Sequence, residues 1–231
     1  MAKKVDYLVQ DSDALLKAIT NNRAAMAAKG FDDDRLAIFV SAKEALKQKE
    51  AAQQAAVKST QDKTAEQDTL IINIHNAILG VRNAAKSAYG SNTQKLKLFQ
   101  VGETIPSSVQ KLRPMCEYLK GVVAAQTAVL LKNGLSQCDI DEFGSAYMNL
   151  IEADAAQENA KKLQKAALLV RDDAADVLRE EVTKTRKFAM AFFSKSPEIL
   201  VEFEPIPKGR RGKGKDDDEA PPPQDGTPPA Q

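Results

Sequence analysis

The placing of proline and glycine constrains this chain more than any other feature of its sequence. The first proline is Pro106, and seven of the ten prolines fall at or after Pro205. Between Phe31 and Leu79 there is neither a proline nor a glycine. Because these two residues interrupt helices most strongly, the chain permits very long helices before its C-terminal segment.

Composition favours helices over sheets. Apolar residues make up 43% of the 231-residue chain, but only 5% of residues are aromatic and there is no tryptophan, so alanine supplies much of the apolar content. Alanine is the best helix former, whereas a β-sandwich or barrel uses β-branched and aromatic residues. The formal net charge of +1 gives no excess of one sign that would indicate a nucleic-acid or membrane partner for the whole chain.

Apolar periodicity predicts four helices, at about residues 5–28, 33–88, 108–132 and 140–194. Aspartates 32–34 suit the start of the second helix, and Ser136 or Asp139 suits the start of the fourth. The second half of helix 33–88 has the 3–4 spacing of a coiled-coil seam. This seam consists of Ile71, Ile74, Ile78, Val81, Ala85 and Ala88. The middle of the helix is polar, so the alternative to one continuous helix is a break near residues 59–62.

Helix 140–194 carries a matching alanine-rich seam, which moves over by one residue at Leu178. Its first part consists of Ala156, Ala160, Leu163, Ala167, Val170, Ala174 and Val177. Since the two long helices are similar in length and composition, we expect them to pack antiparallel. The predicted fold is all-α: an elongated antiparallel helical bundle or coiled-coil hairpin, built on two helices of about 55 residues with two shorter helices packed along it.

Two segments depart from this helical pattern. Residues 95–101 alternate between polar and apolar, which is a strand signal without a partner strand. We therefore expect residues 90–106 to form an extended segment on the bundle, with a hairpin as the minor alternative. Beyond the bundle of residues 1–204, residues 205–231 are rich in proline, glycine and charge, and predict a disordered tail.

Residues that would support catalysis or metal binding are scarce. Cys116, Cys138 and His75 together fall one ligand short of a tetrahedral Cys/His zinc site, and we expect two small, partly buried thiols and a structural histidine. No phosphate loop, dinucleotide fingerprint, nucleophile elbow or zinc-protease motif occurs. The acids at Asp139 and Asp141 suit helix capping better than a calcium loop. We predict no enzyme activity, no catalytic residue, no metal and no cofactor.

Two segments are candidates for contact with other molecules. Large apolar residues gather around the end of the fourth helix, where they form either an interaction surface or the closed end of the bundle. The residues of this candidate surface are Phe188, Phe192, Phe193, Leu200 and Phe203. The second candidate is the basic part of the tail, which acidic residues follow directly and screen. Its residues are Lys208, Arg210, Arg211, Lys213 and Lys215.

These observations favour a non-enzymatic structural or interaction protein that self-associates or scaffolds a partner through coiled-coil surfaces, as a homo-oligomer, with a helical protein partner or as a subunit of a larger assembly. An alternative is a nucleic-acid-associated protein that uses residues 208–215. A second alternative is a membrane-acting, toxin-like bundle, although the apolar stretch at residues 122–131 is short for insertion. The N-terminus lacks the apolar run of a secretory signal, so we expect a cytoplasmic protein, with export by a route without a cleaved signal as the alternative.

Overall fold

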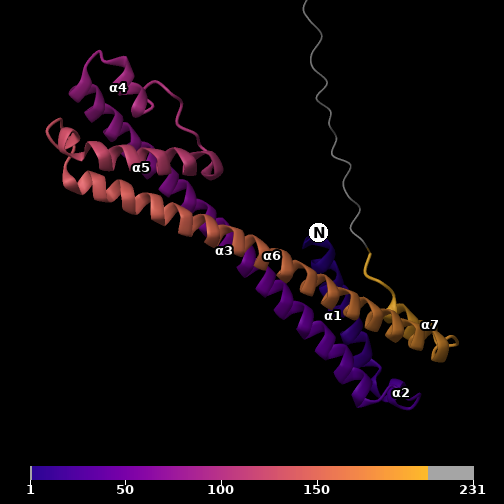
Figure 1. Ribbon diagram of the computed structural model, residues 1–231. Coiled ribbons are helices and arrows are strands. Elements are labelled where there is room, and N and C mark those ends of the chain that lie inside the picture. Colours follow the sequence, from indigo (N-terminus) through magenta and orange to yellow (C-terminus); the bar gives the residue numbers. More distant parts are fainter. Residues whose placement is uncertain (1, 208–231) are drawn as a thin grey trace, which may run out of the picture.

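The computed structural model describes residues 2–207, and all regular secondary structure in this range is helical. The helices in chain order are α1 (Ala2–Asn21), α2 (Arg23–Ala27), α3 (Asp33–Tyr89), α4 (Thr93–Leu98), α5 (Val109–Leu131), α6 (Gln137–Phe192) and α7 (Pro197–Leu200), followed by a 3₁₀ turn at Val201–Phe203. Figure 1 shows α3 and α6 side by side along the whole molecule, with α1, α2 and α7 at one end and α4 and α5 at the other. The predicted all-α architecture is confirmed.

The two long helices are continuous. α3 has 57 residues without a break, so the interruption considered near residues 59–62 does not occur, and at about 1.5 Å per residue the helix is about 85 Å long. The carboxylate of Asp32 accepts the backbone N–H of Arg35 at the start of α3. At the start of α6, Ser136 and Asp139 form a capping box, in which each side chain accepts the other's backbone N–H.

α3 and α6 keep one antiparallel register through their middle. The Gln67 amide donates to Asp154 at 2.8 Å, and the Gln157 amide donates to Thr64 at 3.1 Å. Farther along, Arg171 lies 3.6 Å from Glu50. Between these pairs, moving toward the N-terminus of α3 by a given number of residues corresponds to moving toward the C-terminus of α6 by the same number. These polar layers occupy residues 50–67 of α3 and 154–171 of α6, a segment that we call the waist.

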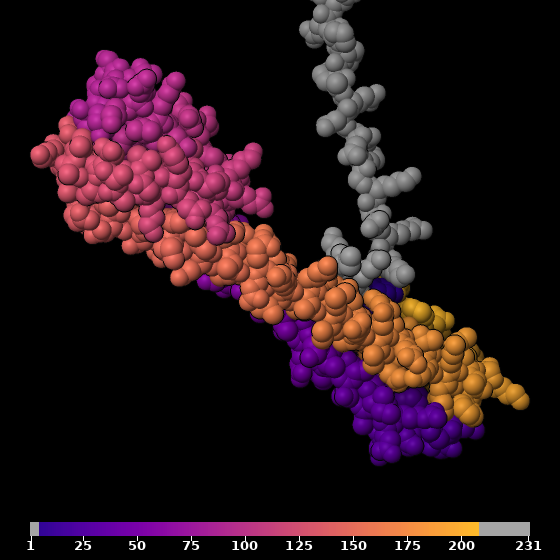
Figure 2. Space-filling view, in the orientation of Figure 1, coloured from indigo at the N-terminus to yellow at the C-terminus, as the bar shows by residue number. Residues whose placement is uncertain are grey.

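Apolar cores lie at the two ends of the rod, on either side of the waist. At one end α1, α3 and α6 share a core around Leu15, Phe39 and Leu178. At the other end α3, α5 and α6 share a core around Ile78, and the neighbouring core around Phe99 also contains the α4 end. The shorter helices thus pack on opposite ends of the α3–α6 pair rather than along its whole length. Figure 2 shows the narrow middle between two thicker ends.

Both short-helix packings use the same side of the α3–α6 pair. Lys43 of α3 donates to Asp13 of α1 at 2.9 Å, while a ring nitrogen of His75 lies 2.8 Å from the Pro106 carbonyl just before α5. In heptad register these two α3 positions occupy neighbouring stripes of one side. We call this side the covered flank and the opposite side the open flank.

Several local expectations are wrong in detail. Residues 93–98 form the short helix α4 instead of an extended segment, because the Asn92 side chain caps it by accepting the N–H of Lys95 at 3.1 Å. Cys116 is buried, but Cys138 is exposed rather than partly buried. In α6, Leu163, Val170 and Val177 lie outside the seam and are exposed. The buried row runs instead through Gln157, Ala160, Arg171 and Ala175. The apolar spacing of the sequence does not predict Gln157 and Arg171 as members of this row.

Candidate interaction surface

The predicted apolar surface at the end of α6 divides into core and exposed residues. Phe193 and Phe203 are buried in the chain's own core, and Leu200 and Phe188 are partly buried against it. Phe192 is half exposed. The Phe188 ring lies edge-on to Phe31 at 5.4 Å and 4.7 Å from the Phe192 ring, measured between ring centroids. Much of this cluster closes one end of the rod, and its binding of a partner stays a prediction.

The open flank is bordered by two rows of every seventh residue. The α6 row is Glu142, Asn149, Ala156, Leu163, Val170, Val177 and Lys184; the α3 row is Ile38, Ala45, Ala52, Ser59, Glu66, Asn73 and Gly80. Continuing the observed register places Ala52 within one residue of the level of Val170, and Ala45 within one residue of the level of Val177. Grooves between the rows appear at both ends, with Asn73 and Asn149 in one and Ile38 and Lys184 in the other. The open flank is therefore one face that runs along the rod.

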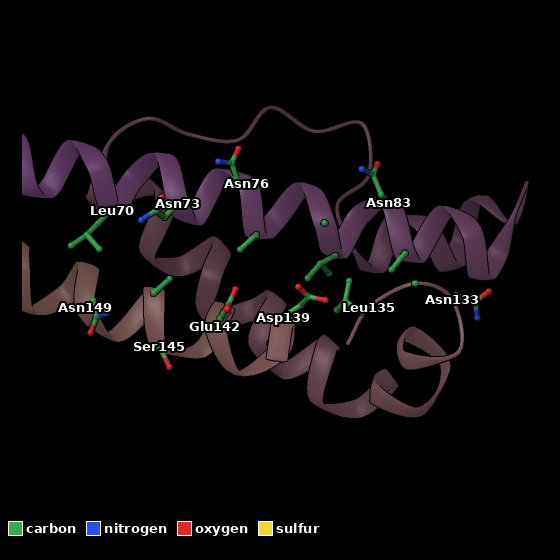
Figure 3. Close-up of a pocket in the computed structure, with 16 residues that line it drawn as sticks. Leu70, Asn73, Asn76, Asn83, Asn133, Leu135, Asp139, Glu142, Ser145 and Asn149 are labelled. Carbon is green, nitrogen blue, oxygen red and sulfur yellow. The ribbon is translucent and has the colours of Figure 1, made fainter. Parts of the chain in front are cut away.

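The larger groove lies at the α5 end of the open flank and encloses about 850 Å³. Figure 3 shows asparagines of α3 along one side, with Glu142, Ser145 and Asn149 of α6 along the other, and the loop that carries Asn133 and Leu135 at one end. Asparagine amides both donate and accept hydrogen bonds. Hydrogen bonds from the Ser136 backbone and hydroxyl lower the pKa of Asp139, so this carboxylate stays ionised as a helix cap.

The α6 side of the middle of the open flank is apolar. Four large side chains of α6 are strongly exposed there, Leu163 at 60%, Leu169 at 58%, Val170 at 45% and Val177 at 54%. Leu163, Val170 and Val177 stand on the flank itself, and Leu169 stands about 100° round α6 from them, on the outer face of the helix. We call these four residues the waist patch. On the α3 side the neighbouring Ala45 and Ala52 are small, which lets another helix approach closely.

The apolar spacing of Leu163, Val170 and Val177 predicts that they belong to the internal seam, whereas the structure places them on the open flank. The signal that distinguishes the two faces is polar rather than apolar. Gln157 and Arg171 lie on the inner face, where Arg171 is only 3% exposed and faces Glu50. A search for facing polar partners between the two helices, rather than for apolar spacing alone, would have identified the outer stripe.

The titratable residues singled out by the sequence show no activated nucleophile. Burial raises the pKa of the Cys116 thiol to about 11, and the hydrogen bond to Glu142 raises the pKa of Cys138. His75 contacts the Pro106 carbonyl. Within residues 2–207, no three His, Cys, Asp or Glu side chains come together as a metal site, and no helix there is both long and apolar enough to cross a bilayer. The predicted basic residues at 208–215 lie outside the described residues.

Comparison with known proteins does not add a relative. No protein-family model, curated protein or solved structure matches the chain.

Proposed function

We propose that this chain is a non-enzymatic interaction protein, a helical rod that self-associates or binds a helical partner through its open flank. The observation that carries the proposal is the waist patch. Four large apolar side chains of one helix are strongly exposed, and three of them border the same flank as the small Ala45 and Ala52 of α3, an arrangement that another helix covers well. Exposed apolar residues grouped in this way are characteristic of interaction surfaces, whereas scattered ones are ordinary.

The architecture supports a role as a spacer. The waist separates two packed ends along continuous helices, so that a partner bound at the waist leaves both ends free for other contacts. The high thiol pKa values and the capping role of Asp139 also suit a structural role better than a catalytic one. A cytoplasmic location is part of this proposal, and fractionation of the native cells tests it.

The experiment compares the native complex of the wild-type chain with that of patch variants. We expect the wild-type chain in gently lysed native cells to migrate as a complex larger than one copy. The double variant Leu163→Lys and Val170→Lys should migrate as a single copy. Ile72→Lys is the matched control, because Ile72 is also 60% exposed but lies on α3 away from the open flank. A wild-type chain that migrates as a single copy would refute the proposal.

The nucleic-acid alternative depends on residues 208–215 and stays a prediction. Binding of duplex DNA at two salt concentrations, with and without residues 208–231, tests it. Binding that weakens with salt and requires these residues would support it, and equal binding by the shortened chain would refute it.

A further inference from the structure

We infer that the occupant of the waist patch is a second copy of this chain, whose α6 packs antiparallel on the α6 of the first. This inference rests on the proposed function and names its partner. Its basis is the self-complementary arrangement of apolar and charged residues about the centre of the patch, near Leu169 and Val170.

The apolar row of the patch is symmetric about its middle. Leu163 and Val177 stand seven residues before and after Val170, on the same stripe of α6. In an antiparallel pair of identical helices crossing at Val170, Leu163 of each copy meets Val177 of the other. The contact is then isologous, since the same surface is used by both copies.

A second row of α6 carries opposite charges at its two ends; it stands about 100° round the helix from the first row, with the stripe of Ala166 and Asp173 between them. Lys162 and Asp176 stand seven residues before and after Leu169, and both side chains are exposed, with Asp176 paired to Arg179 of its own helix. In an antiparallel pair centred between the two rows, the Lys162 of each copy lies level with the Asp176 of the other, so that two ion pairs border the apolar row on one side. A parallel pair in register would instead place Lys162 against Lys162 and Asp176 against Asp176. Charge complementarity thus selects the antiparallel orientation.

Nothing in the described fold obstructs this contact. Val177 stands nine residues before Arg186. At roughly 3.6 residues per turn this is about two and a half turns, so the two side chains point to opposite sides of α6. Arg186 binds Asp11 of α1, so α1 covers the opposite side of α6 from the row of Leu163, Val170 and Val177. The patch is only about four turns long, which is small for a specific interface, and we expect a dissociation constant of about micromolar order.

Charge reversal tests the pairing. Lys162→Glu should weaken the dimer of the purified full-length chain about tenfold, since it places two pairs of like charges together. Asp176→Lys should do the same. The double variant Lys162→Glu and Asp176→Lys should regain most of the wild-type affinity, because each reversed charge meets a reversed partner. Sedimentation equilibrium gives the affinities, and circular dichroism shows that each variant folds. A double variant as weak as the single ones would overturn the inference.

Cysteine cross-linking tests the orientation independently, in a Cys138→Ser background that removes the exposed native thiol. Val170→Cys should form a disulfide between two copies, because it lies at the centre. Leu163→Cys alone should not, since its two copies stand about 20 Å apart, 14 residues of helix. A mixture of Leu163→Cys and Val177→Cys chains should cross-link.

Three outcomes would overturn the antiparallel dimer. Efficient cross-linking of Leu163→Cys with itself would indicate a parallel pair. A purified chain that stays a single copy at high concentration, while the native complex still depends on the patch, would indicate a different helical partner and leave the proposed function standing. A single copy in both settings would refute both.

Discussion

Asp11 of α1 and Arg186 of α6 form a two-pronged ion pair across 175 residues of sequence, with nitrogen–oxygen distances of 2.9 and 2.7 Å. The same carboxylate accepts the backbone N–H of Ile206 at 3.1 Å, and Arg186 Nε donates to the Phe203 carbonyl at 2.9 Å. One buried carboxylate and one guanidinium therefore hold α1, α6 and the segment after α7 together.

Removing this carboxylate should destabilise the α1 end. Asp11→Ala leaves Arg186 without its ionic partner in a mostly buried position, and we expect the free energy of unfolding to fall by about 3 kcal/mol. Urea denaturation measures the change. Glu158→Ala, which breaks an exposed pair with Lys161, is the control and should change stability little. Equal losses in the two variants would contradict the anchoring role of Asp11.

The waist contains a second buried ion pair, between Glu50 and Arg171. Arg171→Ala should cost about 2–3 kcal/mol, because it leaves the largely buried Glu50 carboxylate without its cation. The double variant Glu50→Leu and Arg171→Leu should recover most of that loss, since two apolar side chains need no desolvated partner. A double-mutant cycle by urea denaturation checks this. A double variant less stable than Arg171→Ala would mean that the charges themselves stabilise the waist.

Replacing Gly80 and Gly134 by alanine should change the stability of the protein in opposite directions. Gly80 lies within α3 and has open space where a Cβ would stand, so Gly80→Ala should stabilise the protein by about 0.5–1 kcal/mol. Gly134 has a φ of 101°, which alanine adopts poorly, so Gly134→Ala should destabilise it. Thermal unfolding distinguishes the two signs. A destabilising Gly80→Ala would contradict the open space around Gly80.

The two thiols should react in a fixed order. Cys138 is exposed and Cys116 is buried with a pKa of about 11, so iodoacetamide at pH 8 should modify Cys138 alone until the chain is unfolded. Glu142→Gln should speed the modification of Cys138, because it replaces the carboxylate whose hydrogen bond and charge raise this pKa. Intact-mass time courses measure both rates. Early labelling of Cys116 would reveal opening of the α5 core.

The capping box of α6 should make stability depend on pH. Because the pKa of Asp139 is lowered in the folded chain, its contribution is full above the unfolded value of 3.8 and is lost as the pH falls through the lower folded value. Asp139→Asn should therefore be less stable than wild type at pH 7, and the difference should shrink in acid below that range. A difference that is unchanged down to pH 2 would contradict this account.

The sequence predicted the long-range architecture well because local signals agreed over many residues. The absence of proline and glycine, the acidic start of α3 and the capping pair Ser136 and Asp139 all point to the same helix limits. The antiparallel pairing followed from two helices of matched length. Because several signals indicate the same helices, a wrong assignment of single residues to the buried face did not change the predicted architecture.

Which face of α6 is buried could not be predicted in the same way. Leu163 and Gln157 compete for the inner face, and apolar spacing favours the leucine. The structure instead buries Gln157, which donates to Thr64, and Arg171, which donates to Asp172 and forms an ion pair with Glu50, because these polar partners replace interactions that water would supply. The same limit applies at α4, where the side chain of Asn92 outweighs an alternating pattern.

The hydrogen bond from the Tyr7 hydroxyl to the Ile206 carbonyl, 2.6 Å long, joins α1 to the segment that follows the last 3₁₀ turn. Within residues 2–207, both tips of the rod are made by turns between helices (Figure 1). A shortened chain in which a short linker joins Pro207 to the start of α1, with new ends opened elsewhere, should therefore give a circular permutant with the same helices.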